Sequence, residues 1–149
     1  MEKVFEIYIR STPEQLWHAI TDPEIRTKYD FGVTITSDWT PGSTYTTSHP
    51  RAPRDLTRGE NLVVEPPRRL VQSVVTMWSA EDEAQGTTRI TWAIEQVGDS
   101  CQLILTHDQL RDDAPATLYG GWPMILSGLK TWLETGEVLT TPGSLMYSA

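Results

Sequence analysis

Cysteine is nearly absent from the sequence, because Cys101 is the single thiol among 149 residues. One cysteine rules out a disulfide within the chain and suits a reducing compartment. A domain of this length can bury about 68–70% of the surface that its unfolded chain exposes, so a core can form without covalent links. We predict a single domain that is stabilised by packing.

Long apolar runs are missing as well. No stretch approaches the roughly 20 apolar residues that a membrane-spanning helix needs. The first ten residues, MEKVFEIYIR, carry charges where a signal peptide requires its apolar segment. These features predict a soluble cytoplasmic protein without a membrane partner.

Basic residues are scarce relative to acidic ones. The 12 Lys and Arg stand against 20 Asp and Glu, which gives a formal net charge of -8. Such a molecule repels nucleic acid and anionic lipid on average, and the adjacent arginines in PPRRL are typical of solvated loop charges. We therefore predict no nucleic-acid partner.

Linear signatures of catalysis are also lacking. The sequence has no G-x-S-x-G elbow, no P-loop, no G-x-G-x-x-G and no zincin pair. Its three histidines, His18, His49 and His107, are scattered and have no cysteine or carboxylate at metal-ligand spacing. The sequence thus predicts no metal and no cofactor, and it leaves catalysis unsupported without excluding it.

The N-terminal third contains one strand and two helices. Residues 3–10 alternate apolar and polar side chains, which is the pattern of a half-buried strand. Thr12 can cap a following helix, and Thr21 or Asp22 can cap a second one, because each is followed by a proline suited to the first helical turn.

The middle of the chain is rich in β-branched and aromatic residues, with turn residues at intervals. Consecutive strands joined by short turns form antiparallel meanders, so we expect six further strands in one antiparallel sheet. The expected strands are residues 33–39, 43–49, 57–65, 69–78, 87–95 and 101–107.

The last element is a helix over residues 120–136, GGWPMILSGLKTWLETG. Its apolar residues, from Trp122 to Leu133 and including Trp132, recur at helical spacing, and Gly136 can end it. The helix is long enough to cover the inner face of a curved sheet, and such a grip seldom closes completely. We therefore predict an α+β fold with a cavity between the sheet and this helix.

Several ordered motifs resemble one family, the homologues of the C-terminal domain of the heat shock protein 90 ATPase activator. This family belongs to the START-like, or SRPBCC, superfamily with the helix-grip (Bet v 1-like) fold. The resemblance covers nearly all of residues 1–136, a single domain, and leaves the tail at 137–149 unassigned. The motifs are TPEQLWHAITDPE, SDWTPGSTY, EPPRRLV, TRITWAIE, LILTHD and GGWPMILSGLKTWLETG.

The resemblance implies several functions, since the superfamily includes carriers of hydrophobic ligands, cyclases and chaperone regulators. Our first hypothesis is a noncatalytic module that encloses a small hydrophobic or amphipathic molecule. A second is a stress-response regulator that acts on a heat shock protein 90 homologue. A third is a cavity enzyme of the cyclase or hydrolase type, which would use His107 with Asn61 or Tyr45. The sequence does not indicate an oligomeric state.

Candidate ligand-binding residues come first from the apolar faces. Trp122 can stack on an apolar ligand or can simply belong to the core. We expect Gly128 to face the cavity, because an interior glycine lets something approach the helix backbone. The candidates of this kind are Trp92, Trp122, Ile125, Gly128 and Leu129.

Polar candidates lie on the strands. His107 shares a strand face with Leu103 and Leu105, so its imidazole should point inward, either toward a ligand or toward a backbone carbonyl. Two orientations are open for Asn61. It can point inward, at a position that is typically apolar in the family, and offer a donor and an acceptor to a ligand. Alternatively, it faces water and Leu62 points inward. Tyr45 and Gln72 are the remaining candidates, and the sequence leaves their direction open.

Overall fold

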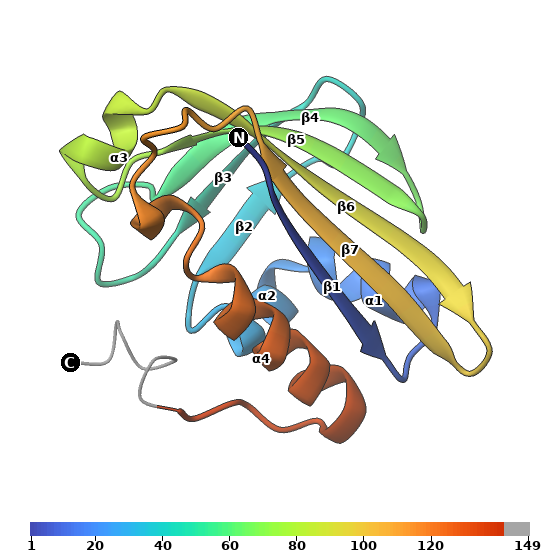
Figure 1. The fold of residues 1–149 in the computed structure, drawn as a ribbon. Helices are drawn as coiled ribbons and strands as arrows, with labels where there is room; N and C mark the ends of the chain where they lie inside the picture. The colour runs from blue at the N-terminus through green and yellow to red at the C-terminus, as the bar shows by residue number, and fades with distance from the viewer. Residues whose placement is uncertain (142–149) are drawn as a thin grey trace.

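A seven-stranded antiparallel sheet forms the main layer of the computed structural model (Figure 1), which describes residues 1–141. The strand order is β1-β7-β6-β5-β4-β3-β2, so β1 and β2 are the two edges. This confirms the predicted α+β helix-grip architecture. The strands are β1 (Lys3–Ile9), β2 (Thr34–Ser37), β3 (Thr44–Ser48), β4 (Thr57–Glu65), β5 (Arg69–Thr76), β6 (Thr87–Val97) and β7 (Ser100–Asp108).

Two short helices connect the edge strands, and both begin at the predicted caps. Helix α1 (Pro13–Thr21) starts where Thr12 Oγ1 accepts a hydrogen bond from the backbone N–H of Gln15, at 3.2 Å. Helix α2 (Pro23–Tyr29) starts where Asp22 accepts from two backbone N–H groups, each at 2.9 Å. Of the two caps proposed for α2, the structure therefore has Asp22.

Two helical segments were not predicted. Helix α3 (Ala80–Ala84) and the 3-10 turn η1 (Ala116–Leu118) lie in stretches with the composition of loops. The Asp82 carboxylate joins them, because its Oδ1 accepts a hydrogen bond from Thr117 Oγ1 at 2.7 Å. Segments of five and three residues are too short to display a helical hydrophobic period.

Helix α4 (Trp122–Thr135) lies across the face of the sheet that α1 and α2 also cover (Figure 1). It ends at Gly136, whose φ of 75° is the left-handed conformation that glycine adopts without strain. None of the helices in residues 1–141 combines the length and the apolar character of a membrane span.

The core lies between the inner face of the sheet and these three helices. Strands β6 and β7 supply alternate side chains, and α4 supplies one face. Fully buried residues on both sides of this contact include Ile9, Leu16, Ile20, Leu70, Trp92, Leu103, Leu105, Leu126 and Leu129.

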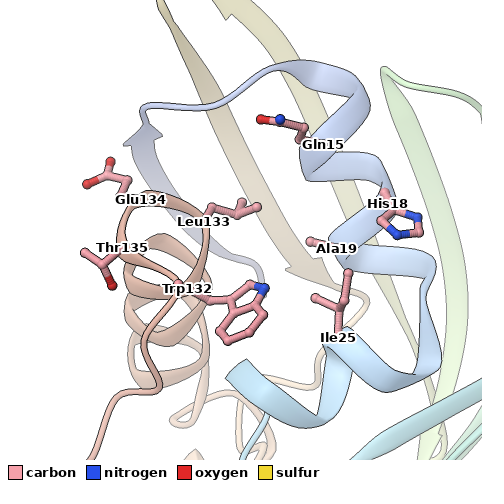
Figure 2. Close-up of a pocket in the computed structure, with 9 residues that line it drawn as sticks. Gln15, His18, Ala19, Ile25, Trp132, Leu133, Glu134 and Thr135 are labelled. Atoms are coloured by element: carbon pink, nitrogen blue, oxygen red, sulfur yellow. The ribbon is translucent and has the colours of Figure 1, made fainter.

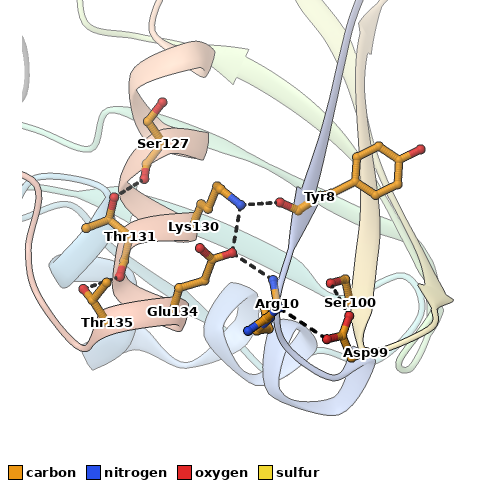
Figure 3. A network of polar contacts seen from close by, with 9 residues as sticks. All are labelled: Tyr8, Arg10, Asp99, Ser100, Ser127, Lys130, Thr131, Glu134 and Thr135. Atoms are coloured by element: carbon orange, nitrogen blue, oxygen red, sulfur yellow. Dashed lines mark hydrogen bonds and ion pairs between the residues drawn. The ribbon is translucent and has the colours of Figure 1, made fainter.

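The edge strand β1 is closed by side chains of α4 (Figure 3). Lys130 Nζ donates a hydrogen bond to the backbone oxygen of Tyr8 at 2.6 Å, and the N–H of Arg10 donates to Glu134 Oε2 at 2.9 Å. Lys130 and Glu134 also pair with each other at 2.8 Å. One open backbone group of the edge strand and one just beyond its end are therefore occupied, which fixes α4 against the sheet.

Residues 137–141 run back beside α4, where Thr141 Oγ1 contacts Met124 Sδ at 3.1 Å. The remainder of the tail that the sequence left unassigned, residues 142–149, lies outside the described residues.

Candidate functional site

A chain of hydrogen bonds crosses the interior from α4 to the sheet. Trp122 Nε1 donates to His107 Nδ1 at 3.2 Å, and His107 Nε2 lies 2.8 Å from Thr88 Oγ1. An indole can only donate, so Nδ1 must accept and the imidazole proton sits on Nε2. Thr88 therefore accepts from His107 and donates onward to the backbone oxygen of Val74, at 3.4 Å.

His107 is a neutral, buried imidazole. Its side chain lies inside the fold, as the strand alternation predicts, and the residue is 1% exposed. Burial lowers the pKa of His107 to about 4, and the neighbouring Asp108 carboxylate opposes that change. The hydrogen-bond partners of the ring are the side chains of Thr88 and Trp122, and neither is the backbone carbonyl that the sequence allowed as a partner.

Trp92 lies on the inner face of β6 and packs against Trp122 of α4. The two indoles meet edge to face, with ring centroids 5.6 Å apart and an interplanar angle of 87°. Trp92 is 1% exposed, yet its Nε1 has no hydrogen-bond partner. An orphaned buried donor of this kind costs about 1–3 kcal/mol. Among the buried side-chain nitrogens and oxygens of residues 1–141, this is the one without a partner.

Helix α2 brings an ion pair into the same region. Arg26 Nε donates to Asp30 Oδ2 at 2.8 Å, and each residue is only 7% exposed. The guanidinium carbon lies 5.8 Å from the ring centroid of Tyr29 and 5.9 Å from that of Trp92. Among the described residues, the guanidinium leaves no buried nitrogen without a partner.

The local sequence explains why this pair is buried. Residues 26, 29 and 30 are spaced so that they share one face of α2, and the Tyr29 hydroxyl fastens that face by donating to the Ala19 backbone oxygen at 2.9 Å. Gly128 of α4 lets the helices meet, since a Cβ there would lie 2.8 Å from the Tyr29 backbone oxygen.

Burial and mutual contact shift the pKa values of the ionisable groups in this cluster. Burial lowers the pKa of Arg26, but the interactions with Tyr29, Asp30 and Tyr45 outweigh it, so the pKa is raised and the guanidinium stays charged. Burial raises the pKa of the Tyr29 and Tyr45 phenols, and Arg26 opposes that rise. Both phenols are therefore neutral donors. Burial also raises the pKa of Asp30, against the effect of Arg26.

Sequence reasoning missed Arg26 and Asp30. Opposite charges four residues apart in a short helix are typical of a solvated surface pair, so the spacing carries no sign of burial. The one usable hint was Tyr29, whose large ring had to occupy the same face as both charges.

Asn61 points inward, and Leu62 is 47% exposed, so the first of the two orientations considered is the one present. Its amide is fully engaged by the protein. Nδ2 donates to the hydroxyls of Ser37 at 2.8 Å and Ser43 at 3.0 Å, while Oδ1 accepts from Gln72 Nε2 at 3.0 Å. The predicted donor and acceptor thus link β4 to β2, to β5 and to the turn before β3, and a ligand role for Asn61 and Gln72 stays a prediction.

Tyr45 is also buried, and its hydroxyl donates to the Ser73 backbone oxygen at 2.7 Å. Gly59 lies opposite Tyr45 in the β3–β4 pairing. A Cβ at Gly59 would stand 1.9 Å from the Ser73 oxygen, so the sheet requires glycine there. The same Cβ would lie 3.0 Å from Tyr45 Cε1, so the Tyr45 ring passes close to Gly59.

The expectation that Gly128 faces a cavity beside the sheet is wrong. The space in front of it is filled by the α2 backbone at Tyr29. Leu129 is fully buried in the core, and Ile125 packs against the core while partly exposed. Of the nine candidates, the structure brings Trp92, Trp122 and His107 into direct contact and joins Asn61 to Gln72.

A groove of about 430 Å³ lies elsewhere, between α1, the start of α2 and the end of α4 (Figure 2). The indole of Trp132 reaches from α4 toward Ala19 and Ile25, which form an apolar floor with Leu133. Trp132 is half-buried, so it belongs to this groove more than to the core that the helical spacing predicted. The polar lining comes from Gln15, His18, Glu134 and Thr135.

The described residues hold no group of three or more His, Cys, Asp or Glu side chains arranged to bind a metal ion. Cys101 is buried and unpaired, and its thiol donates to the Ser11 backbone oxygen at 3.1 Å. Neither feature adds chemistry to the interior cluster.

Comparison with known proteins places this fold in a family. The model of the family described as "Activator of Hsp90 ATPase homolog 1-like protein" matches residues 10–134. The chain belongs to this family. Among proteins with curated descriptions, none matches the chain.

Solved structures agree on the fold. MLL2253 from Mesorhizobium loti is 19% identical, with 93% of this chain and 100% of that one covered and a TM-score of 0.77. An HSP90 activator from Plasmodium falciparum is 18% identical, with 89% and 96% covered and a TM-score of 0.73. The Aha1 dimer from Colwellia psychrerythraea is 19% identical, with 91% and 98% covered and a TM-score of 0.73. Identities this low establish the shared fold alone.

Proposed function

We propose that the protein is a noncatalytic binding module that takes up a small, largely apolar molecule between the sheet and helices α2 and α4. The observation that carries this proposal is the orphaned Nε1 of Trp92, a donor that is fully buried among aromatic side chains. Unpartnered buried groups are rare in native structures, and a ligand acceptor would remove the cost of this one. We also propose that this binding occurs in the cytoplasm.

Uptake requires a side chain to move, because Trp92 and Trp122 pack directly on each other. Trp122 is the better candidate for this movement, because it is the first residue of α4. Its indole is tied by the hydrogen bond from Nε1 to His107, which a rotation would have to break. Helix ends open at lower free energy than helix centres. Rotation of Trp122 would expose the Trp92 ring and create the space that a flat molecule needs.

Two measurements test this proposal. Native mass spectrometry of the purified protein, before and after denaturation, detects a ligand that copurifies with it. Titration with the neutral apolar fluorophore N-phenyl-1-naphthylamine should show saturable binding near one molecule per chain and quench tryptophan emission. Absence of both a copurified ligand and saturable binding would refute the proposal.

A second candidate is regulation of a heat shock protein 90 homologue, in line with a stress-response role. It is supported by the family and by the α1–α4 groove, where Trp132 offers a half-buried aromatic side chain to a partner. A purified heat shock protein 90 homologue should then bind the protein and change its ATPase rate, and Trp132→Ala should weaken binding. An unchanged rate with no detectable complex would remove this candidate.

The third hypothesis, an enzyme that uses His107 with Asn61 or Tyr45, gains no support. Both ring nitrogens of His107 are engaged, and in the described structure no hydrogen bond joins it to Asn61 or Tyr45.

A further inference from the structure

We propose that the α1–α4 groove binds a basic segment of a protein partner. The segment inserts one or two bulky apolar side chains beside Trp132 and sets Lys or Arg side chains against an acidic rim. The inference deepens the second candidate function and rests on it for the choice of this surface. It adds the chemistry of the partner segment.

The floor of the groove is apolar and has an aromatic wall. Ala19, Ile25 and Leu133 form the floor, and the half-buried indole of Trp132 reaches across it (Figure 2). With a volume of about 430 Å³, the groove is near the lower end of the range for ligand pockets. Tryptophan is enriched among the residues that contribute most to binding at protein interfaces. The groove therefore suits one or two large side chains of a larger partner.

The segments that line the groove are acidic. Residues 13–25 and residues 131–138 contain no Lys or Arg, and they carry the carboxylates of Glu14, Asp22, Glu24, Glu134 and Glu137. Within residues 1–141, the side chains of Glu14, Glu24 and Glu137 form no ion pair. Unpaired negative charge at the rim attracts a basic segment and repels an acidic one.

The basic residues next to these segments leave that charge in place. Arg26 is buried and pairs with Asp30 inside the fold, and Lys130 pairs with Glu134 at 2.8 Å. Lys28 is exposed, and its single positive charge stands against three unpaired carboxylates. The rim therefore keeps a net negative charge, in line with the net charge of -8 of the whole chain.

Two other occupants fit the groove less well. The chain leaves the groove at Gly136 and runs back beside α4, where Thr141 contacts Met124 at 3.1 Å, so the described part of the tail leads away from it. A second copy that docked through a two-fold axis would set the same acidic rim against itself, which repulsion between like charges opposes. A basic partner segment meets neither obstacle.

The test uses a matched set of short amphipathic peptides. The first combines leucine with lysine, the second replaces every lysine by glutamate, and the third replaces every leucine by alanine. Calorimetric titration of the full chain at low ionic strength measures their binding. We expect the leucine–lysine peptide to bind with a stoichiometry near one, and about tenfold or more tighter than either of the others. Added salt should weaken this binding.

A pair of tryptophan variants locates the apolar contact. Trp132→Ala should weaken binding of the leucine–lysine peptide by about tenfold or more, because it removes the aromatic wall of the groove. Trp78→Ala is the matched control, since it truncates a tryptophan that is 43% exposed and does not line the groove. The control should bind the peptide as the wild type does. Equal losses in both variants would overturn the inference.

A pair of charge variants separates the rim from the overall charge. Glu24→Lys/Glu137→Lys reverses two exposed carboxylates beside the groove and should weaken binding by about tenfold at low ionic strength. Glu81→Lys/Glu95→Lys makes the same change in net charge on exposed residues of α3 and β6, and it should weaken binding much less. Equal effects of the two double variants would show that net charge alone attracts the peptide, which overturns the inference.

Circular dichroism and thermal unfolding show whether each variant has folded. If Trp132→Ala or a charge variant does not fold, the amide chemical shifts of the isotope-labelled wild type decide the question. The leucine–lysine peptide should then perturb residues 15–25 and 132–136 most strongly. Perturbation confined to other parts of the chain overturns the inference.

The outcomes also separate this inference from the function on which it rests. If a heat shock protein 90 homologue binds the chain while the leucine–lysine and leucine–glutamate peptides bind equally or not at all, the inference fails and that candidate stands. Peptide binding in the groove without a complex with the homologue supports the chemistry assigned to the groove and removes that partner. If dimerisation of the chain or N-phenyl-1-naphthylamine perturbs the groove amides and the peptide does not, the occupant is a second copy or a small molecule, and the inference is overturned.

Discussion

Trp122 and His107 are joined by a hydrogen bond of 3.2 Å that ties the first residue of α4 to the inner face of β7, one residue before the strand ends. The bond needs a neutral imidazole, because Nδ1 must accept from the indole. Protonation of His107 would replace an acceptor by a donor at the point where α4 meets the sheet.

The first prediction concerns acid stability. The pKa of His107 is about 4 in the fold and about 6.5 when unfolded, so the unfolded chain binds more protons between these values. The free energy of unfolding should therefore be fully retained above pH 6.5 and fall as the pH drops toward 4, by about 2 kcal/mol between pH 7 and 4.5. Urea denaturation at several pH values measures this change.

His107→Gln supplies the control for that prediction. The variant removes the titrating ring and keeps a polar side chain, so the part of the pH dependence between 6.5 and 4 should flatten. A wild type and variant with the same pH dependence would show that His107 is not the responsible group.

The second prediction concerns Gly128. Alanine normally stabilises a helix by about 1 kcal/mol relative to glycine. Here its Cβ would lie 2.8 Å from the Tyr29 backbone oxygen, a contact that neither helix can relieve by rotating a side chain. We expect Gly128→Ala to destabilise the fold by about 1–3 kcal/mol, the usual cost of overpacking. Chemical denaturation measures it.

Ser127→Ala is the neighbouring control, because Ser127 is exposed in the same helix. Its effect should stay within about 0.5 kcal/mol. A Gly128→Ala variant as stable as this control would mean that α2 and α4 are not packed as closely as described.

The strands and helix caps could be predicted because their signals are local. Alternation alone predicted β6 and β7, and Asp22 before a proline marked the start of α2. The direction of Gly128 could not be predicted, since a residue without a side chain does not reveal whether a sheet or a helix faces it. Asn61 and Leu62 stayed ambiguous because a register shift between Asn61 and Val63 interrupts the alternation of β4.

The site was harder to predict than the fold. His107 and Trp122 lie on the elements where the sequence placed them, but their mutual hydrogen bond depends on how α4 is seated on the sheet. Arg26 became part of the interior only through packing of α2 on α4. Long-range packing leaves no mark in a seven-residue helix, so residue spacing could not distinguish this buried pair from a surface one.

The third prediction compares the stability cost of truncating a core residue with that of truncating a residue at the groove. Leu129 is fully buried, and Leu129→Ala should cost about 2–5 kcal/mol in the free energy of unfolding. Trp132 is half-buried beside the α1–α4 groove, so Trp132→Ala should cost about 1 kcal/mol, below the 3–5 kcal/mol typical of a buried tryptophan. Urea denaturation of both variants makes the comparison. A Trp132→Ala loss equal to that of Leu129→Ala would place Trp132 in the core.

The last prediction concerns the energetics of the Arg26–Asp30 pair. Arg26→Met leaves the Asp30 carboxylate buried without its partner, and loss of one member of a buried pair typically costs about 3–5 kcal/mol. Arg26→Met/Asp30→Leu removes both charges, and replacement by apolar side chains is often neutral or stabilising. We therefore expect the double variant to be more stable than the single variant by a few kcal/mol, roughly the penalty of the stranded charge. Denaturation at pH 7 tests this order. A double variant less stable than Arg26→Met would mean that the unpaired Asp30 carboxylate carries no such penalty, and a double variant less stable than the wild type would mean that the pair itself stabilises the fold.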